Sequence, residues 1–494
     1  MPVGPVTVHS RAPEGLDNPP VDVEVYVGPG LPGLAIVGLV ETAVKESRDR
    51  VRAAIRSSGF DMPDRRIVVS LAPADLPKKG SRYDLAIAIG ILCASKQLPT
   101  AQLAHCEFLG ELSLTGQLRR IPGSLPSAMA ALQAGRRVIV AADCEAEVGM
   151  LRNPDVLVAR YLLEVAEFMA NTGIIRSAKP YIRNETVTEH DLQDVEGQAA
   201  AKRALEIAAA GRHHLLLRGP PGTGKSMLAA RLSDLLPPLN EAEFLETAAL
   251  FSLRGQTIAN WLRRPMRSPH HSATAAALVG GGSDPRPGEV SLAHNGVLFL
   301  DELPEFNRHT LEMLREPIEA GYISIARSRN TIRFPARFQL IAAMNPCPCG
   351  YLGDNKHECR CTPHQVRQYQ TKISGPLLDR IDISVELGRE KISLLTKGNT
   401  GESTATVRQR IAVADSQARK RCGKANAALS PAEVRRWCWP DTAGLQLLEQ
   451  AAAKFALSRR ACDRTLRVAR SIADLAEQDV VLAAHVAEAL SLRP

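Results

Sequence analysis

Residues 219–226 read Gly-Pro-Pro-Gly-Thr-Gly-Lys-Ser, a pattern typical of loops that bind nucleotide phosphates. The loop follows an apolar strand pattern at residues 215–217 and precedes a helical pattern at 227–236, the order that such a loop requires. Glycines let successive backbone amides face a phosphate, and the helix N-terminus adds a positive dipole. We expect Lys225 to contact the β- and γ-phosphates of ATP and Ser226 to ligate Mg²⁺, within a loop formed by Gly219, Pro220, Pro221, Gly222, Thr223, Gly224, Lys225 and Ser226.

An acidic pair, Asp301 and Glu302, follows the apolar strand pattern of residues 296–300. We expect Asp301 to hold the Mg²⁺ shell and Glu302 to polarise the attacking water, because phosphoryl transfer needs charge neutralisation and an oriented nucleophile. An acidic pair after a strand is, by itself, more often a solvated loop. Combined with the phosphate loop, it predicts a site that hydrolyses ATP.

Asn345 follows a third strand pattern, residues 338–342. In combination with the two motifs above it is typical of sensor 1, a polar residue that positions water near the γ-phosphate. The alternative is an Asn that only caps a turn.

Four of the ten cysteines crowd into one short stretch, which indicates metal chemistry. Zinc is the default ion, since sites with four sulfur ligands are structural and the cytoplasm keeps thiols reduced. Iron–sulfur ligation is disfavoured, because one residue rather than the commoner two separates the members of each pair. Reduced or redox-active thiols remain the alternative to a zinc site formed by Cys347, Cys349, Cys359 and Cys361. The adjacent His270 and His271 are expected to make loop contacts rather than to bind metal.

The elements that position these residues fall into three parts, as expected for a chain of 494 residues. Residues 1–180 alternate strand and helix patterns without a phosphate loop, residues 190–390 carry the motifs above, and residues 391–494 have helical spacing. We predict a mixed α/β fold: an α+β domain, a P-loop α/β ATPase domain and a helical lid.

The composition, with 45% hydrophobic and 23% charged residues, is that of an ordinary globular protein. No apolar run reaches the roughly 18 residues of a membrane span, and no signal segment begins the chain, so we expect a cytoplasmic protein. The net charge of +8 favours an anionic partner such as nucleic acid.

Further motifs are spread over nearly the whole chain: His9–Arg11, Ala43–Ser47, Arg50–Arg52, Asp194–Gln198, Ser268–His271, Leu278–Gly282, Pro285–Gly288, Leu300–Glu305 and Gly375–Ile381. Together they resemble the ComM/YifB family of magnesium-chelatase-like AAA+ proteins. This resemblance implies hexameric rings and ATP-driven DNA helicases that promote branch migration during natural transformation. The implied partners are single-stranded or branched DNA and further copies of the chain.

The resemblance also assigns two arginines. Arg380 matches the arginine finger that reaches the γ-phosphate bound by the neighbouring subunit, and a guanidinium suits that role because it stays charged and chelates phosphate oxygens. An internal salt bridge with Asp379 or Asp382 is the alternative. Arg460 fits sensor 2 on the lid, with Arg464 as the substitute candidate and a solvated basic stripe as the plainer interpretation.

Residues 322–334 have the alternation of a hairpin around a cationic tip. The hairpin resembles the pre-sensor hairpin that ring helicases project into their central pore. There Arg327, Arg329 and Arg333 would hold DNA phosphates regardless of sequence, the alternative being an ordinary charged surface hairpin.

The segment Leu76–Leu85 resembles the part of Lon-type protease domains that carries the nucleophilic serine. Arg82 occupies the position of that serine and Ser81 is displaced by one residue. We therefore predict a Lon-like fold without a Ser/Lys dyad and without peptidase activity.

Three functions follow from these patterns. A DNA motor needs the ATP site, a ring interface and basic pore residues, and the sequence offers candidates for all three. A magnesium-chelatase-like or protein-remodelling ATPase without helicase activity is the alternative. An ATP-dependent protease would need a nucleophile that the sequence does not display.

Overall fold

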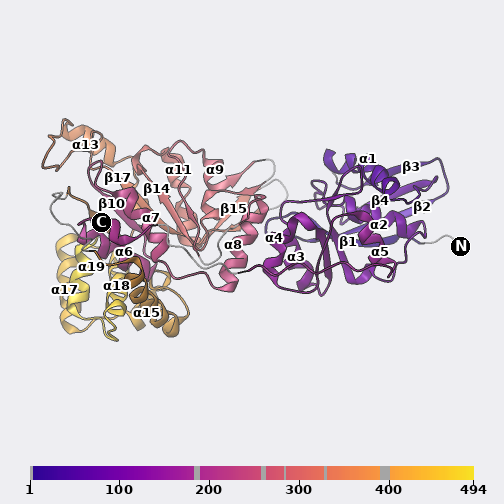
Figure 1. Ribbon diagram of the computed structural model, residues 1–494. Helices are drawn as coiled ribbons and strands as arrows, with labels where there is room; N and C mark the ends of the chain where they lie inside the picture. Colours follow the sequence, from indigo (N-terminus) through magenta and orange to yellow (C-terminus); the bar gives the residue numbers. More distant parts are fainter. Residues whose placement is uncertain are drawn as a thin grey trace. The chain divides into compact units, whose positions relative to one another are not determined.

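The computed structural model describes residues 4–39, 41–182, 190–257, 263–282, 285–326, 331–389 and 401–493. Its contacts divide the chain into two compact units (Figure 1). Unit 1 comprises Met1–Asn184, Glu241–Ala259 and Ala326–Ile332, and unit 2 comprises Glu185–Asn240, Asn260–Ile325 and Arg333–Pro494. Segment 241–259, which we expected inside the ATPase domain, is thus part of unit 1, and the helical C-terminal region shares a unit with the ATPase core.

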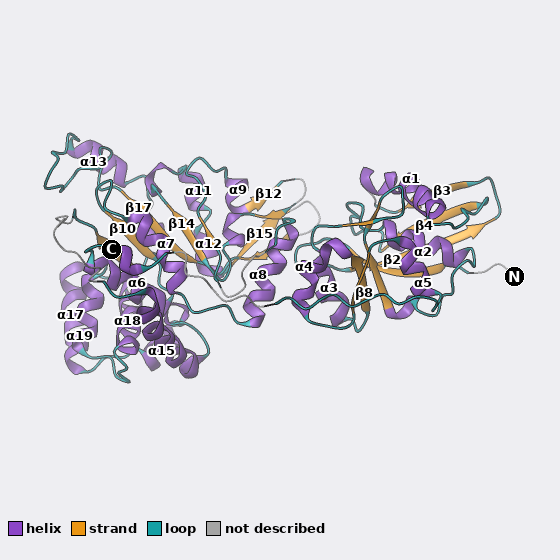
Figure 2. Ribbon diagram, viewed as in Figure 1, coloured by secondary structure: helices purple, strands orange, loops and turns teal. Residues whose placement is uncertain are grey.

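Unit 1 is built on one mixed sheet of seven strands (Figure 2). The strands in spatial order are β3 (Gly33–Val37), β4 (Arg66–Ala72), β2 (Pro20–Gly28), β1 (Val6–Arg11), β5 (Cys106–Leu109), β8 (Arg137–Ala141) and β9 (Val156–Ala159). Strand β2 is antiparallel to both β1 and β4, whereas β1, β5, β8 and β9 run parallel. A short hairpin pairs β6 (Glu111–Leu112) with β7 (Leu118–Arg119).

The central helix of unit 1 is α2 (Asp84–Ala94), whose residues 84–93 are all buried. It packs on β1 and β2 and against α1 (Thr42–Ser57), which explains why its sequence is apolar on every side. At its N-terminus the buried carboxylate of Asp84 accepts hydrogen bonds from Ser47 and Arg50. The remaining helices along the chain are α3 (Ser124–Gln133), α4 (Glu145–Val148) and α5 (Leu162–Met169).

Helix α8 (Glu241–Leu253) packs on α3 within unit 1. The contact is polar at its centre, because Ser252 Oγ and Ser124 Oγ donate to the same oxygen of Glu147, at 2.6 and 2.7 Å. Arg120 pairs with the other oxygen of this buried carboxylate. A buried carboxylate needs such donors, so these residues specify where α8 attaches.

Unit 2 contains a parallel sheet of five strands with helices around it. The strands in spatial order are β11 (Met266–Arg267), β14 (Val297–Leu300), β17 (Gln339–Met344), β10 (Leu215–Arg218) and β18 (Ile383–Glu386). Helices that accompany this sheet are α6 (Ala199–Gly211), α7 (Lys225–Leu235), α9 (Ala275–Val279), α10 (Glu289–Leu292), α11 (Arg308–Glu312), α12 (Arg315–Ala320), α13 (Pro363–Gln370) and α14 (Gly375–Leu378). Two short ladders pair β12 (Gly280–Gly281) with β13 (Arg286–Pro287) and β15 (Tyr322–Ala326) with β16 (Thr331–Pro335).

The C-terminal region is helical, as expected: α15 (Thr404–Cys422), α16 (Pro431–Trp437), α17 (Thr442–Phe455), α18 (Arg459–Leu475) and α19 (Ala483–Ser491). Helices α15 and α18 pack on α6, and their apolar side chains, including Ile411 and Leu466, share one core with Leu215 and Ile341 of the sheet. This shared core explains why the region is not a separate compact unit. Across the described ranges, no helix combines the length and apolarity needed to cross a bilayer.

His214 ties the start of β10 to β17 and provides a pH-dependent contact. Its Nδ1 accepts a hydrogen bond from the Leu340 amide at 2.9 Å, and its own amide donates to Asp382 Oδ2 at 3.0 Å. Burial lowers the pKa of His214, and His213 opposes its protonation while Asp382 favours it. The folded protein therefore keeps the neutral ring that accepts from Leu340.

We predict that the free energy of unfolding falls as pH drops below about 6.5, where histidine begins to bind protons in the unfolded chain. His214→Asn retains an acceptor that does not titrate, so its stability should decline less steeply between pH 7 and pH 5. Between pH 7 and pH 5 the variant should lose about 1 kcal/mol less of its free energy of unfolding than the wild type, which is the net value of one buried hydrogen bond. Urea unfolding followed by circular dichroism measures it, and equal slopes for both proteins would refute the assignment.

Candidate nucleotide-binding site

The phosphate-loop motif connects β10 to α7 at the carboxyl edge of the parallel sheet. Gly222 and Gly224 have φ angles of 77° and 86°, a region that side chains disfavour, and Gly224 is the N-cap of α7. A Cβ atom at Gly219 would lie 2.5 Å from the carbonyl oxygen of Leu387. The glycines are thus required by the backbone geometry, and the amide end of α7 faces the loop.

Lys225 is folded against this loop. Its Nζ donates to the carbonyl oxygens of Gly219 (2.7 Å) and Pro220 (2.8 Å) and to Oδ1 of Asn345 (3.1 Å). Burial lowers the pKa of Lys225, an effect that the nearby charges of Asp301 and Glu302 oppose. A cation held by neutral oxygens in a partly buried loop is positioned to exchange these acceptors for phosphate oxygens.

Ser226 and Asp301 meet at the head of the site. Ser226 Oγ donates to Asp301 Oδ2 at 2.6 Å, and Asp301 Oδ1 accepts from the amide of Glu302 at 2.9 Å. A hydroxyl and a carboxylate in contact are the hard oxygen donors that Mg²⁺ prefers beside nucleotide phosphates. The donor set therefore fits magnesium, with Ser226 and Asp301 as the residues that would hold it.

The order of the strands explains this convergence. Strand β17, which ends just before Asn345, lies between β14, which ends just before Asp301, and β10, which leads into the loop. Parallel strands end at the same edge of a sheet. The Asn345 amide oxygen therefore reaches Lys225, and the Asp301 carboxylate reaches the adjacent Ser226.

Glu302 has a partner that the sequence did not reveal. Its Oε2 lies 3.2 Å from Nδ1 of His271, and its backbone has a φ of 51°. His271 follows the edge strand β11, which pairs with β14 in parallel, so both residues lie beyond neighbouring strand ends. The Ser-Pro-His-His motif after an edge strand is the signal that would have suggested this contact, whereas we expected only loop contacts.

The two predicted arginines converge on another acidic side chain. Arg380 Nη2 and Arg460 Nη2 lie 2.7 and 3.3 Å from the same oxygen of Glu319, and Arg380 Nη1 donates to the carbonyl of Pro376 at 2.6 Å. Arg464 instead lies 3.7 Å from Asp379. Arg380 is thus in an internal ion pair, but with Glu319 rather than with the neighbouring Asp379 or Asp382.

The predicted hairpin corresponds to β15 and β16. The exposed Arg333 places its guanidinium 5.0 Å from the ring centre of Tyr322, a cation–π contact across the two strands. Arg327 and Arg329 lie outside the described residues.

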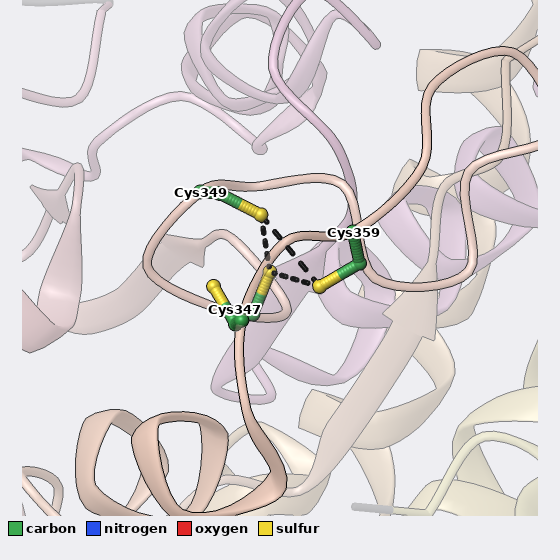
Figure 3. A group of neighbouring side chains, drawn as sticks. Cys347, Cys349 and Cys359 are labelled. Atoms are coloured by element: carbon green, nitrogen blue, oxygen red, sulfur yellow. Dashed lines mark hydrogen bonds between the residues drawn. The ribbon is translucent and has the colours of Figure 1, made fainter.

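The four clustered cysteines come together at one point, in a segment that we call the cysteine knuckle (residues 347–361). Figure 3 shows three of them, Cys347, Cys349 and Cys359. The Sγ atoms of Cys347 and Cys349 are 3.4 Å apart, and each lies 3.6 Å from Sγ of Cys359. All four sulfurs, including that of Cys361, lie within 4.8 Å of one another. Backbone N–H groups, first that of Tyr351, lower the pKa of Cys349 to about 6, so this sulfur is readily a thiolate.

In unit 1, Ser81 and Arg82 have other partners than a lysine. Ser81 Oγ donates to Glu111, and Arg82 donates to the carbonyl of Pro122 at 2.6 Å and to Ser127 at 3.2 Å. The buried Lys78 donates to the carbonyl of Pro73. These contacts contain no Ser–Lys pair, and the absence of peptidase activity stays a prediction.

Comparison with known proteins covers nearly the whole chain. The family models that match are "Subunit ChlI of Mg-chelatase" at residues 23–144, "Magnesium chelatase, subunit ChlI" at 191–395 and "Magnesium chelatase, subunit ChlI C-terminal" at 401–493. The uncharacterized protein YifB of Escherichia coli is 50% identical over 489 residues, 98% of this chain and 96% of YifB. Competence protein ComM of Haemophilus influenzae is 46% identical over 495 residues, 98% of this chain and 97% of ComM.

Two further relatives match only part of the chain. Lon protease 2 of Bacillus subtilis is 33% identical over 141 residues, 26% of this chain and 25% of the protease, in keeping with the Lon-like N-terminal region. A probable DNA helicase MCM9 of Oryza sativa is 28% identical over 178 residues, 36% of this chain and 22% of that protein. The full-length similarities show that the chain belongs to the magnesium-chelatase-like AAA+ family that includes YifB and ComM.

Proposed function

We propose that the protein is an ATPase that forms hexameric rings, moves DNA strands as a helicase and promotes branch migration during recombination and natural transformation. The observation that carries the ATPase part is the meeting of Lys225 and Ser226 with Asn345 and Asp301. These contacts join the phosphate loop, the end of β14 and the end of β17 into one site.

Each side chain has a defined task in this proposal. Lys225 would exchange the loop carbonyls for the β- and γ-phosphates of ATP, and Ser226 and Asp301 would hold Mg²⁺, which would supply charge neutralisation on the phosphates. Glu302 leaves His271 and orients the attacking water, and Asn345 fixes that water near the γ-phosphate. Arg380 stabilises the charge that develops in the site of the neighbouring subunit, and Arg460 links the lid to the nucleotide.

The DNA part of the proposal is supported by the competence relative, the helicase relative and the charge of the chain. Arg333 is exposed on the hairpin and is stacked on Tyr322, which holds the guanidinium in place without neutralising it. Contacts of such side chains with phosphates are independent of base sequence and weaken with salt.

Arg333→Ala tests this surface. We expect its affinity for single-stranded DNA, measured by fluorescence anisotropy, to fall about fivefold, and the dependence of affinity on salt to become shallower by about one ion. Arg435→Ala, which removes an exposed arginine from α16, is the matched control and should bind DNA normally. Equal affinities of both variants and the wild type would remove the hairpin from the DNA-binding surface.

The family models favour one alternative, a magnesium-chelatase-like or protein-remodelling ATPase without helicase activity. Strand displacement decides between them. A labelled three-stranded branched substrate should be resolved by the wild-type protein with ATP and left intact with a non-hydrolysable analogue. ATP hydrolysis without displacement on branched or tailed substrates would favour the alternative.

A further inference from the structure

The four sulfurs of the cysteine knuckle have the spacing of a closed metal site. Zinc–sulfur bonds of about 2.3 Å in a tetrahedron place the sulfurs about 3.8 Å apart, and three of the separations here are 3.4, 3.6 and 3.6 Å. A disulfide requires about 2.05 Å. The arrangement in Figure 3 therefore corresponds to ligands around a common centre rather than to bonded pairs.

The knuckle also touches the phosphate loop. Its Gly350 is buried, and a Cβ atom there would lie 2.8 Å from Cδ of Pro221 and 3.8 Å from Cγ of Asn345. The amide of Gly350 donates to the carbonyl of Cys347 at 3.0 Å. The turn that carries two of the sulfurs is therefore pressed against both the loop and the residue that contacts Lys225.

A second set of contacts joins the knuckle to the chain that follows β18. The buried carboxylate of Asp354 forms an ion pair of 3.2 Å with Arg389, whose guanidinium also lies 5.9 Å from the ring centre of Tyr351. Two residues earlier, the Leu387 amide donates to the carbonyl of Arg218 at 2.7 Å, and Leu387 closes tightly on Gly219.

The start of the phosphate loop is thus enclosed on two sides. The Gly219 amide donates to Met344, the residue before Asn345, at 3.2 Å, and Leu387 covers its other side. Both of these flanking segments continue into contacts of the knuckle, one through Cys347 and the other through Arg389. The knuckle therefore contacts both segments that flank the start of the loop.

We propose that Cys347, Cys349, Cys359 and Cys361 bind one zinc ion and that the zinc-folded knuckle braces the phosphate loop, so that zinc occupancy sets the affinity for ATP. The inference rests on the proposed function only in that the loop binds ATP. Without the ion, weak contacts such as those of 3.6 Å between Cys359 and the sulfurs of Cys347 and Cys349 join the two cysteine pairs, and Gly350 is held less firmly against Pro221.

Metal content and nucleotide affinity, measured on the full-length chain, test the first half. We expect one zinc per chain in purified protein by mass spectrometry of the metal. Removing it with a zinc-selective chelator should weaken binding of a fluorescent ATP analogue about tenfold in the presence of Mg²⁺, and added zinc should restore it. Cys359→Ser combined with Cys361→Ser should lose both zinc and the effect of added zinc.

Two glycines test the mechanical link without altering the ligands. Gly350 and Gly353 both have left-handed φ angles, 86° and 78°, but a Cβ atom at Gly353 meets nothing within 4 Å. Gly350→Ala should keep zinc yet weaken ATP binding about fivefold, because its methyl group displaces Pro221. Gly353→Ala carries the same backbone strain and should keep both zinc and affinity.

The outcomes are separable from those of the proposed function, because binding is measured without DNA and without hydrolysis. Iron in place of zinc, no bound metal, affinity that ignores zinc removal, or equal affinities of the two glycine variants would each overturn the inference. A wild-type protein with full zinc that binds no ATP would instead refute the proposed ATPase.

Discussion

Glu302→Gln is expected to lower the rate of ATP hydrolysis about 100-fold or more while leaving ATP binding intact. Glutamine keeps the shape of the side chain but neither accepts a proton nor polarises water as a carboxylate does, and general-base catalysis contributes about that factor. The contacts of Lys225, Ser226 and Asp301, which we propose to bind phosphate and magnesium, do not involve the Glu302 side chain. Phosphate release and binding of a fluorescent nucleotide measure the two effects separately.

The matched control is Glu305→Gln. Glu305 ends the short helix that begins after Glu302, and its side chain lies 3.5 Å from Lys372 on the surface. Its amide variant should hydrolyse ATP at close to the wild-type rate. Glu302→Gln protein that turns over at the same rate as Glu305→Gln would show that another group orients the water.

Arg380→Ala should lower hydrolysis about 1,000-fold, the usual contribution of an arginine that stabilises phosphoryl transfer. In one chain Arg380 is paired with Glu319, and under the proposed function it reaches the nucleotide bound by the neighbouring subunit. Lys225→Ala disables the phosphate loop but leaves Arg380 in place. In mixed rings of the two variants, a subunit with an intact loop sometimes lies beside one with an intact arginine, and activity should return.

A ring assembled from equal amounts of the two variants should contain such restored sites at about a quarter of its interfaces, as expected for random placement in a cyclic assembly. Coexpression with two affinity tags isolates the mixed rings, and rings of each variant alone are the control. Mixed rings no more active than either parent would place the action of Arg380 within its own chain.

Local patterns could be predicted from the sequence. The phosphate loop needs glycines at left-handed positions and a strand and helix on either side, all of which lie within a few residues of Lys225. The helical spacing predicted for the C-terminal part is equally local, and helices α15 to α19 confirm it.

Contacts between distant segments could not be predicted. The pairing of His271 with Glu302 depends on β11 lying beside β14. The shared Glu319 of α12 is contacted by Arg460 of α18 and by Arg380, which follows α14. The sequence of α8 does not indicate which helix it packs against, so the hydrogen bond from Ser252 to Glu147 is known only from the structure. Spacing likewise suggested the cysteine cluster but not the contact of Gly350 with Pro221.

The most direct test of the central claim is the rate of ATP hydrolysis with and without single-stranded and branched DNA, on the wild type and on Glu302→Gln. We predict that both kinds of DNA raise the rate of ATP hydrolysis by the wild type, and that branched DNA does so at concentrations that do not saturate the protein. Neither kind of DNA should change the rate of Glu302→Gln. Hydrolysis that is abolished in Glu302→Gln but unaffected by both kinds of DNA in the wild type would contradict the DNA motor and leave an ATPase that acts on another partner.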